Sequence, residues 1–171
     1  MPARVITVFL FLGLLIPLTL QTASAQDSGL VTYKALPPEA AMTAAMTAMQ
    51  NCSASGYQVA VAVVDRGGNL QALVRDRYAG PHTPDTARRK AWTAVSFRSN
   101  TSALAETTGP DAPNSGVRHV TGALMLGGGV LIEAGDGALV GGIGVSGAPS
   151  GDLDDACAEA GLEAIADLLA F

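Results

Sequence analysis

Two stretches of alternating apolar and polar residues, each interrupted by a glycine-containing turn, dominate the hydrophobicity pattern of this chain. In the first stretch, residues 57–65 alternate and are rich in valine, which is typical of a half-buried strand. Residues 66–69 (Arg-Gly-Gly-Asn) supply turn residues, and residues 70–75 provide a returning strand. The pattern predicts an antiparallel hairpin over these residues.

The second stretch lies near the C-terminus. Apolar residues 130–132 and 139–145 flank an Asp-Gly turn at residues 136–137, and Asp-Gly between two β-rich runs is a strong hairpin signal. Glycines are dense around this hairpin, at residues 127–129 and within residues 141–147. Because glycine permits another backbone or a flat group to approach closely, we expect a neighbouring subunit or a flat ligand against this region.

Apolar residues recur at three- and four-residue steps in the segments outside the hairpins, which predicts helices. The first predicted helix begins at residues 37–39 (Pro-Pro-Glu), ends at Gly56 and packs a methionine-rich stripe into the core. The second runs from Thr83, as its N-cap, to about Arg98, because Thr-Pro-Asp is a favourable helix start. The last helix covers residues 152–169. The methionine-rich stripe consists of Met42, Ala45, Met46, Met49 and Cys52.

The segment between the second helix and the second hairpin is less regular. Residues 99–107 are compatible with a short helix, residues 108–116 read as a polar loop, and residues 117–126 fit either a strand or an apolar turn of helix. Hairpins separated by helices predict an α+β fold in which helices pack on an antiparallel sheet.

The N-terminus has the pattern of an export signal. Arg4 precedes an uncharged apolar run over residues 5–20, and Ala-Ser-Ala at residues 23–25 fits a cleavage site. We therefore expect a signal peptide over residues 1–25, a polar lead-in over residues 26–36 and one domain over residues 37–171. An uncleaved membrane anchor is the alternative interpretation; after cleavage the domain has no predicted membrane contact.

The composition excludes several functional classes. The net charge is −5, and removing the segment that contains Arg4 makes it −6. An acidic chain in which aromatic residues are 5% of the total is a poor nucleic-acid binder. The glycines at 127–129 lack the Gly-Lys-Ser/Thr of a phosphate loop, and Ser146 does not lie in a Gly-x-Ser-x-Gly motif. We predict no catalytic residue and no enzymatic activity.

The chain contains two cysteines, Cys52 and Cys157, one in the first predicted helix and one in the last. In an exported chain such a pair is often oxidised. If the two helices pack side by side, the cysteines can form a disulfide that closes most of the domain. The alternative is two buried thiols, since cysteine is also a small core residue.

His82 is the polar residue with the clearest potential for chemistry. It stands at the N-terminus of a predicted helix, where the positive dipole end disfavours a second proton on the imidazole and leaves a lone pair free for a metal. Arg88, Arg89 and Lys90 follow within two turns and could pair with ligand carboxylates. The alternative is a surface histidine beside a solvated basic face. His119 is a second candidate ligand.

Four segments carry a resemblance to a known family. Residues 141–147 (Gly-Gly-Ile-Gly-Val-Ser-Gly) and 154–158 (Asp-Asp-Ala-Cys-Ala) resemble the C-terminal part of the GlcG/HbpS family of small haem-binding proteins. Residues 61–70 resemble its first hairpin, and residues 89–94 (Arg-Lys-Ala-Trp-Thr-Ala) resemble its central helix. The resemblance covers residues 37–169, nearly the whole predicted mature chain.

The resemblance implies a profilin-like fold, non-covalently bound haem and a homo-oligomer. In such a fold the first and last helices share one face of the sheet, which would bring Cys52 and Cys157 together. Haem would be held with His82 as the iron ligand and with Arg88, Arg89 and Lys90 near its propionates; His119 is the alternative ligand. Covalent attachment is excluded because the sequence has no Cys-x-x-Cys-His motif.

The resulting hypothesis is an exported, periplasmic or extracellular protein that sequesters or senses haem or iron without turnover of its own. The resemblance leaves open an incidental degradation of haem when peroxide is present. A second interpretation is a binding protein or enzyme for a small organic acid such as glycolate, in which Arg75, Arg88 and Arg89 hold the carboxylate. A third is an accessory subunit without a ligand.

Overall fold

The computed structural model describes residues 29–170. The chain divides into two units, residues 1–31 and residues 32–171, and every feature described below belongs to the second. The predicted signal peptide, residues 1–25, lies outside the described residues.

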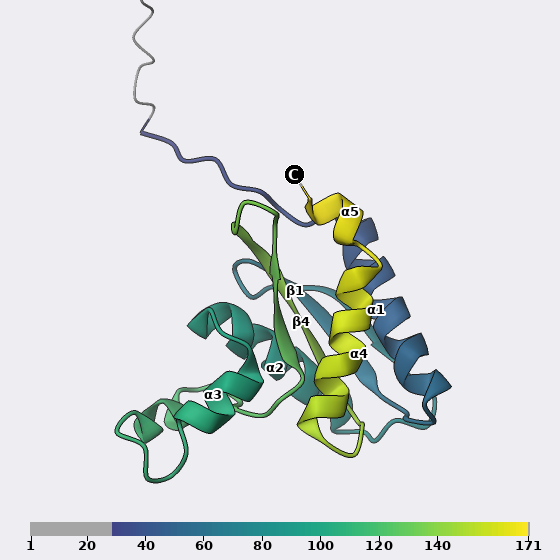
Figure 1. Ribbon diagram of the computed structural model, residues 1–171, viewed down its shortest axis with the longest axis vertical. Coiled ribbons are helices and arrows are strands. Elements are labelled where there is room, and N and C mark those ends of the chain that lie inside the picture. Colours follow the sequence, from purple (N-terminus) through teal and green to yellow (C-terminus); the bar gives the residue numbers. More distant parts are fainter. Residues whose placement is uncertain (1–28, 171) are drawn as a thin grey trace, which may run out of the picture. The chain divides into compact units, whose positions relative to one another are not determined.

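Four antiparallel strands form one sheet in the order β2-β1-β4-β3. The two predicted hairpins are confirmed, and they join through the central pair of β1 and β4. The predicted α+β fold is confirmed as well, since helices cover both faces of this sheet (Figure 1). The strands are β1 (Ala60–Asp65), β2 (Leu70–Arg75), β3 (Gly129–Glu133) and β4 (Leu139–Ser146).

One face of the sheet is covered by α1 (Pro38–Ala54) and α4 (Gly151–Glu163), which lie side by side (Figure 1). The odd-numbered valines of β1, Val61 and Val63, point into this layer together with Ile143 of β4. Such alternation places apolar side chains on one face in period two. The result is one continuous aliphatic core between the sheet and the two helices.

The face of α1 that enters this core is made mainly of alanines. The predicted methionine-rich stripe is wrong at Met42 and Met46, whereas its Ala45 and Cys52 are buried and its Met49 packs against the core. Met42 and Met46 are exposed, whereas Ala41, Ala44 and Ala48 are completely buried. The reason is the close approach of α4: a Cβ on Gly161 would lie 2.5 Å from the carbonyl oxygen of Ala44. At such a short distance only the smallest side chains fit between the helices.

Cys52 of α1 and Cys157 of α4 form a disulfide, as predicted, with a Cα–Cα distance of 5.6 Å. Both residues are buried. The bond joins positions 105 residues apart and fixes the two helices of this layer to each other.

The opposite face of the sheet is covered by α2 (Thr83–Phe97). Here the even-numbered residues of β1, including Ala60 and Ala62, pack on Ala87. Strand β4 presents glycines to the helix: a Cβ on Gly142 would lie 2.9 Å from the carbonyl oxygen of Ala91, and one on Gly144 would collide with that of Ala87. The helix backbone therefore rests directly on the strand.

The segment that follows α2 contains α3 (Thr101–Thr107) and a 3-10 helix, η1 (Ser115–His119). Of residues 117–126, which the sequence left open between strand and helix, the first three belong to η1; residues 120–128 form neither a helix nor a strand. Side chains of α2 hold this 120–128 segment: Arg89 donates to the carbonyls of Gly122 and Ala123, and the Leu124 N–H donates to Thr93 Oγ1.

The predicted final helix is interrupted at residues 164–165, and its last turn forms a separate short helix, α5 (Ala166–Leu169). Within residues 29–170 no helix is long and apolar enough to span a bilayer.

Candidate functional site

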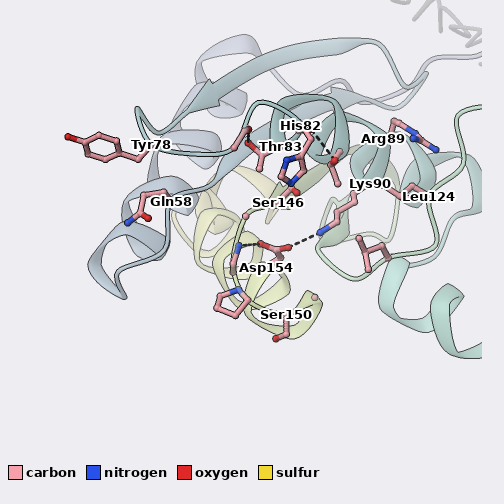
Figure 2. A pocket seen from close by; sticks show the side chains of 17 residues that line it. Gln58, Tyr78, His82, Thr83, Arg89, Lys90, Leu124, Ser146, Ser150 and Asp154 are labelled. Atoms are coloured by element: carbon pink, nitrogen blue, oxygen red, sulfur yellow. Dashed lines mark hydrogen bonds and ion pairs between the residues drawn. The ribbon is translucent and has the colours of Figure 1, made fainter.

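A pocket of about 620 Å³ opens at the end of the sheet where β4 finishes (Figure 2). Its walls are the first turns of α2 and α4, the segments 146–151 and 78–80, and residues of the 120–128 segment. This volume is within the range of small-molecule sites. The lining includes Gln58, Tyr78, Gly80, His82, Thr83, Thr86, Arg89, Lys90, Leu124, Leu126, Ser146, Gly147, Ala148, Pro149, Ser150, Gly151 and Asp154.

Two helix N-termini meet at this pocket. The N-cap of α2 is His82, so the prediction that Thr83 caps the helix is wrong; the Thr83 hydroxyl instead donates to the carbonyl of Gly80. The N-cap of α4 is Ser150, whose Oγ accepts from the N–H of Leu153. Because the N-terminus of each helix carries a partial positive charge, the pocket favours negatively charged groups.

The imidazole of His82 lies at the pocket, folded against Gly80 (Figure 2). A Cβ on Gly80 would be 2.8 Å from His82 Cε1 and 3.0 Å from Nδ1, so the glycine makes room for the ring. His82 is exposed, and neither ring nitrogen has a hydrogen-bond partner in the described part of the chain. Both nitrogens are therefore available to a ligand.

Lys90 and Asp154 form a buried ion pair at the same pocket, with 2.7 Å between Lys90 Nζ and Asp154 Oδ2. The ammonium also donates to the Val145 carbonyl, and Asp154 Oδ1 accepts from the Ala148 N–H. Burial raises the pKa of the Asp154 carboxyl above its ordinary value, although Lys90 favours the charged form. The predicted ligand-binding ammonium of Lys90 is thus already paired within the protein.

The glycines at 127–129 pack on this ion pair. A Cβ on Gly128 would lie 2.6 Å from the Val145 carbonyl oxygen and 2.7 Å from Lys90 Nζ, and one on Gly129 would lie 2.5 Å from the Lys90 carbonyl oxygen. The expectation that these glycines face another subunit or a flat ligand is wrong: the groups that approach them belong to the chain's own α2, β4 and α4.

The two predicted arginines occupy different environments. Arg89 lines the pocket, but its guanidinium holds the carbonyls of Gly122 and Ala123. Arg88 does not line the pocket and forms an exposed ion pair with Asp85. Arg75, the third residue of the suggested carboxylate-binding set, donates to the Arg77 carbonyl and also lies outside the lining. The structure does not bring these three arginines together.

His119 is exposed at the end of η1 and does not line the pocket. Among the predicted haem-site residues, the pocket therefore gathers His82, Arg89 and Lys90 and leaves out Arg88 and His119. Within the described residues, no group of three or more His, Cys, Asp or Glu side chains is placed to hold a bare metal ion. A metal at His82 would need other ligands, such as those of a porphyrin.

Comparison with known proteins decides the family. The model of the family described as haem degrading protein HbpS-like matches residues 36–163. This chain belongs to the HbpS-like family. The family predicted from the sequence is confirmed. No curated protein matches the chain.

Solved structures agree with this assignment of the HbpS-like chain. A double mutant of Streptomyces reticuli HbpS is 41% identical with a TM-score of 0.75, over 88% of this chain and 98% of that one. A PduOC–haem complex is 30% identical with a TM-score of 0.72, over 77% and 96% of the two chains. Klebsiella pneumoniae ORFY, at 24% identity and a TM-score of 0.75 over 82% and 97%, shares the fold.

Sequence reasoning missed two features of the site in this HbpS-like chain. Asp154 was noted only within the Asp-Asp-Ala-Cys-Ala motif, and Ser146 only as a serine outside a Gly-x-Ser-x-Gly motif. Asp155, beside Asp154, has a structural role: it accepts from the Ser102 hydroxyl and from the Gly128 N–H. An available signal for Ser146 was its alternation with Val145, which places it on the α2 face of the sheet.

Proposed function

We propose that this HbpS-like protein binds haem non-covalently in the pocket between α2 and α4, with His82 as the protein ligand to the iron. The observation that carries the proposal is the imidazole of His82, which lies at the pocket with both nitrogens unbonded within the described residues. A neutral imidazole is a common protein ligand for haem iron.

The other residues of the lining suit a porphyrin. Leu124, Leu126 and the exposed ring of Tyr78 offer apolar surface, while the two helix N-termini offer positive potential for carboxylates. The haem complex of PduOC, a relative at 30% identity, supports the same ligand. When bound, the haem supplies a redox-active iron; His82 supplies the protein's bond to it, and the pocket walls limit access of water.

The proposal also covers the biological setting. The signal-like N-terminus supports export, and the disulfide is compatible with an oxidising compartment. We propose that the protein forms a homo-oligomer that sequesters or senses haem or iron, and that the chain has no catalytic turnover of its own.

The test is a hemin titration of the oxidised mature chain followed by the Soret band. We expect a saturable band with the wild type, its loss or strong shift in the His82→Ala variant, and no change in the His119→Ala variant. His119 is a matched control because it is an exposed histidine outside the pocket. An unchanged band in His82→Ala, or the absorbance of free hemin with the wild type, would overturn the proposal.

A further inference from the structure

Besides the imidazole of His82, the hydroxyl of Ser146 is a polar group of the pocket without a hydrogen-bond partner in the described part of the chain. Ser146, the last residue of β4, is 5% exposed and lines the pocket (Figure 2). Its side chain has no hydrogen-bond partner among residues 29–170. Hydroxyls of largely buried side chains are normally paired, so this one is open to a partner from outside the chain, which can be water or a ligand in the pocket.

The other hydroxyls of the α2 wall show the contrast. Thr83 Oγ1 donates to the Gly80 carbonyl at 2.8 Å, and Thr86 Oγ1 donates to the His82 carbonyl at 3.0 Å. These side chains complete the backbone hydrogen bonding of the helix start. Ser146 has no such role.

The first turn of α4 presents further donors to the same pocket. Gly151, the first residue of this 13-residue helix, has an N–H group with no acceptor within the described chain; the N–H of Asp152 has none either, but Asp152 does not line the pocket. Ser150 and Gly151 line the pocket with Ser146. Free N–H groups at a helix start, together with the helix dipole, favour an anionic oxygen ligand.

Most charged side chains around the pocket already have partners within the protein. Of the ionisable lining residues other than His82, Arg89 and Lys90 are cations and Asp154 is an acid already paired with Lys90. The neighbouring Asp155 bonds to Ser102 and Gly128, and Asp152 is exposed. The positive partial charge at the wall formed by Ser146 and the α4 start is therefore that of the backbone N–H groups at the helix start.

We propose that Ser146 and the first N–H groups of α4 form a carboxylate subsite of this pocket. The Ser146 hydroxyl and the backbone N–H groups donate hydrogen bonds, and the two carboxylate oxygens accept them. In its haem form the inference rests on the proposed function, and the carboxylate is then a propionate. A free small carboxylate has the same chemistry and would occupy the same subsite.

The test compares hemin with hemin dimethyl ester, in which both propionates are esterified. With the wild-type protein we expect hemin to bind at least about tenfold more tightly than the ester, as one charged hydrogen bond contributes. The Ser146→Ala variant should lose about tenfold in hemin affinity and leave ester affinity unchanged. The Ser96→Ala variant, which changes an exposed serine of α2 outside the pocket, should behave as the wild type toward both.

Acetate at constant ionic strength provides the second arm, read as a rise in the unfolding temperature. Stabilisation of the wild type but not of Ser146→Ala supports the subsite, even if hemin fails to bind and the proposed haem function falls. If hemin binds equally well to wild type and Ser146→Ala, the subsite is overturned while haem binding stands. If neither hemin nor acetate distinguishes the two proteins, the inference is also overturned.

Discussion

The two faces of the sheet are closed by different means. On the α1 and α4 face, a continuous aliphatic core and the Cys52–Cys157 disulfide join the layers. On the α2 face, glycines of β4 let the helix backbone rest on the strand, and the buried pair of Lys90 and Asp154 links α2 to α4 of the other layer.

As a result, the disulfide and most of the apolar core lie in one part of this small domain, and the pocket lies in another. The residues that line the pocket come from the starts of α2 and α4 and from the end of β4, whereas the disulfide and the valine core lie away from it. Most of the apolar burial lies on the side of α1 and α4, whereas the pocket holds the side chains of His82 and Ser146, which have no hydrogen-bond partner within the described residues.

The largest expected effect comes from opening the covalent link. Replacing both cysteines by serine should lower the free energy of unfolding by about 4–5 kcal/mol, because the bond closes a loop of 105 residues in the unfolded chain. Denaturant titration measures this loss. The single variants and the reduced wild type should give nearly the same value, and a loss below about 1 kcal/mol would show that the covalent closure contributes little.

Breaking the ion pair of Lys90 and Asp154 tests the polar link between α2 and α4. The Lys90→Met variant leaves Asp154 buried without its partner, and we expect unfolding to become easier by about 3–4 kcal/mol. Equilibrium unfolding in urea measures the change. The double variant Lys90→Met with Asp154→Leu should recover a large part of the loss, since no charge is then left unpaired. No recovery would mean that the pair has a packing role only.

Acidification should have the smallest effect on the stability of the fold. It distinguishes the contribution of the ion pair from that of the β1–β2 turn. The pKa of Asp154 is raised by burial, so on acidification the folded chain takes up this proton before the unfolded chain does, which favours folding. Asp65 behaves in the opposite way. Burial opposes ionisation, but hydrogen bonds from Asn69, Gly67 and Gly68 outweigh it and lower the Asp65 pKa.

The stability contributed by Asp65 is therefore present above its ordinary pKa of 3.8 and is lost as the pH falls through its lower folded value. The Asp65→Asn variant keeps the acceptor oxygen without titrating, so its unfolding temperature should decline less steeply below pH 3.8 than that of the wild type. Scanning calorimetry across this range decides the point; parallel curves would show that the acid sensitivity lies elsewhere.

Local patterns predicted the elements because each is determined by neighbouring residues. The two hairpins follow from valine alternation and from the turns at residues 66–69 and 136–137, and the order of elements then indicates the layers. The methionine-rich stripe was misjudged because hydropathy favours methionine over alanine, whereas the short distance between α1 and Gly161 admits only alanine.

The site was less predictable because its contacts are not local. Lys90 and Asp154 are 64 residues apart, and in sequence one looks like an exposed cation and the other like a helix-capping acid. The glycines at 127–129 correctly indicated close approach, but glycine does not specify what approaches. His82 could be predicted because a helix start is visible in sequence, whereas the freedom of its ring depends on Gly80 and on the surrounding walls.

The position of the disulfide along α4 has a consequence for recognition. Cys157 comes less than two turns after Gly151, so the bond to α1 anchors the same short helix whose leading amides border the pocket. A ligand meeting the oxidised protein finds these amides already in place and spends little entropy on arranging them. Reduction of the disulfide would not alter the side chains that line the pocket. It would give the start of α4 more conformational freedom, and the protein would lose that freedom when a ligand binds.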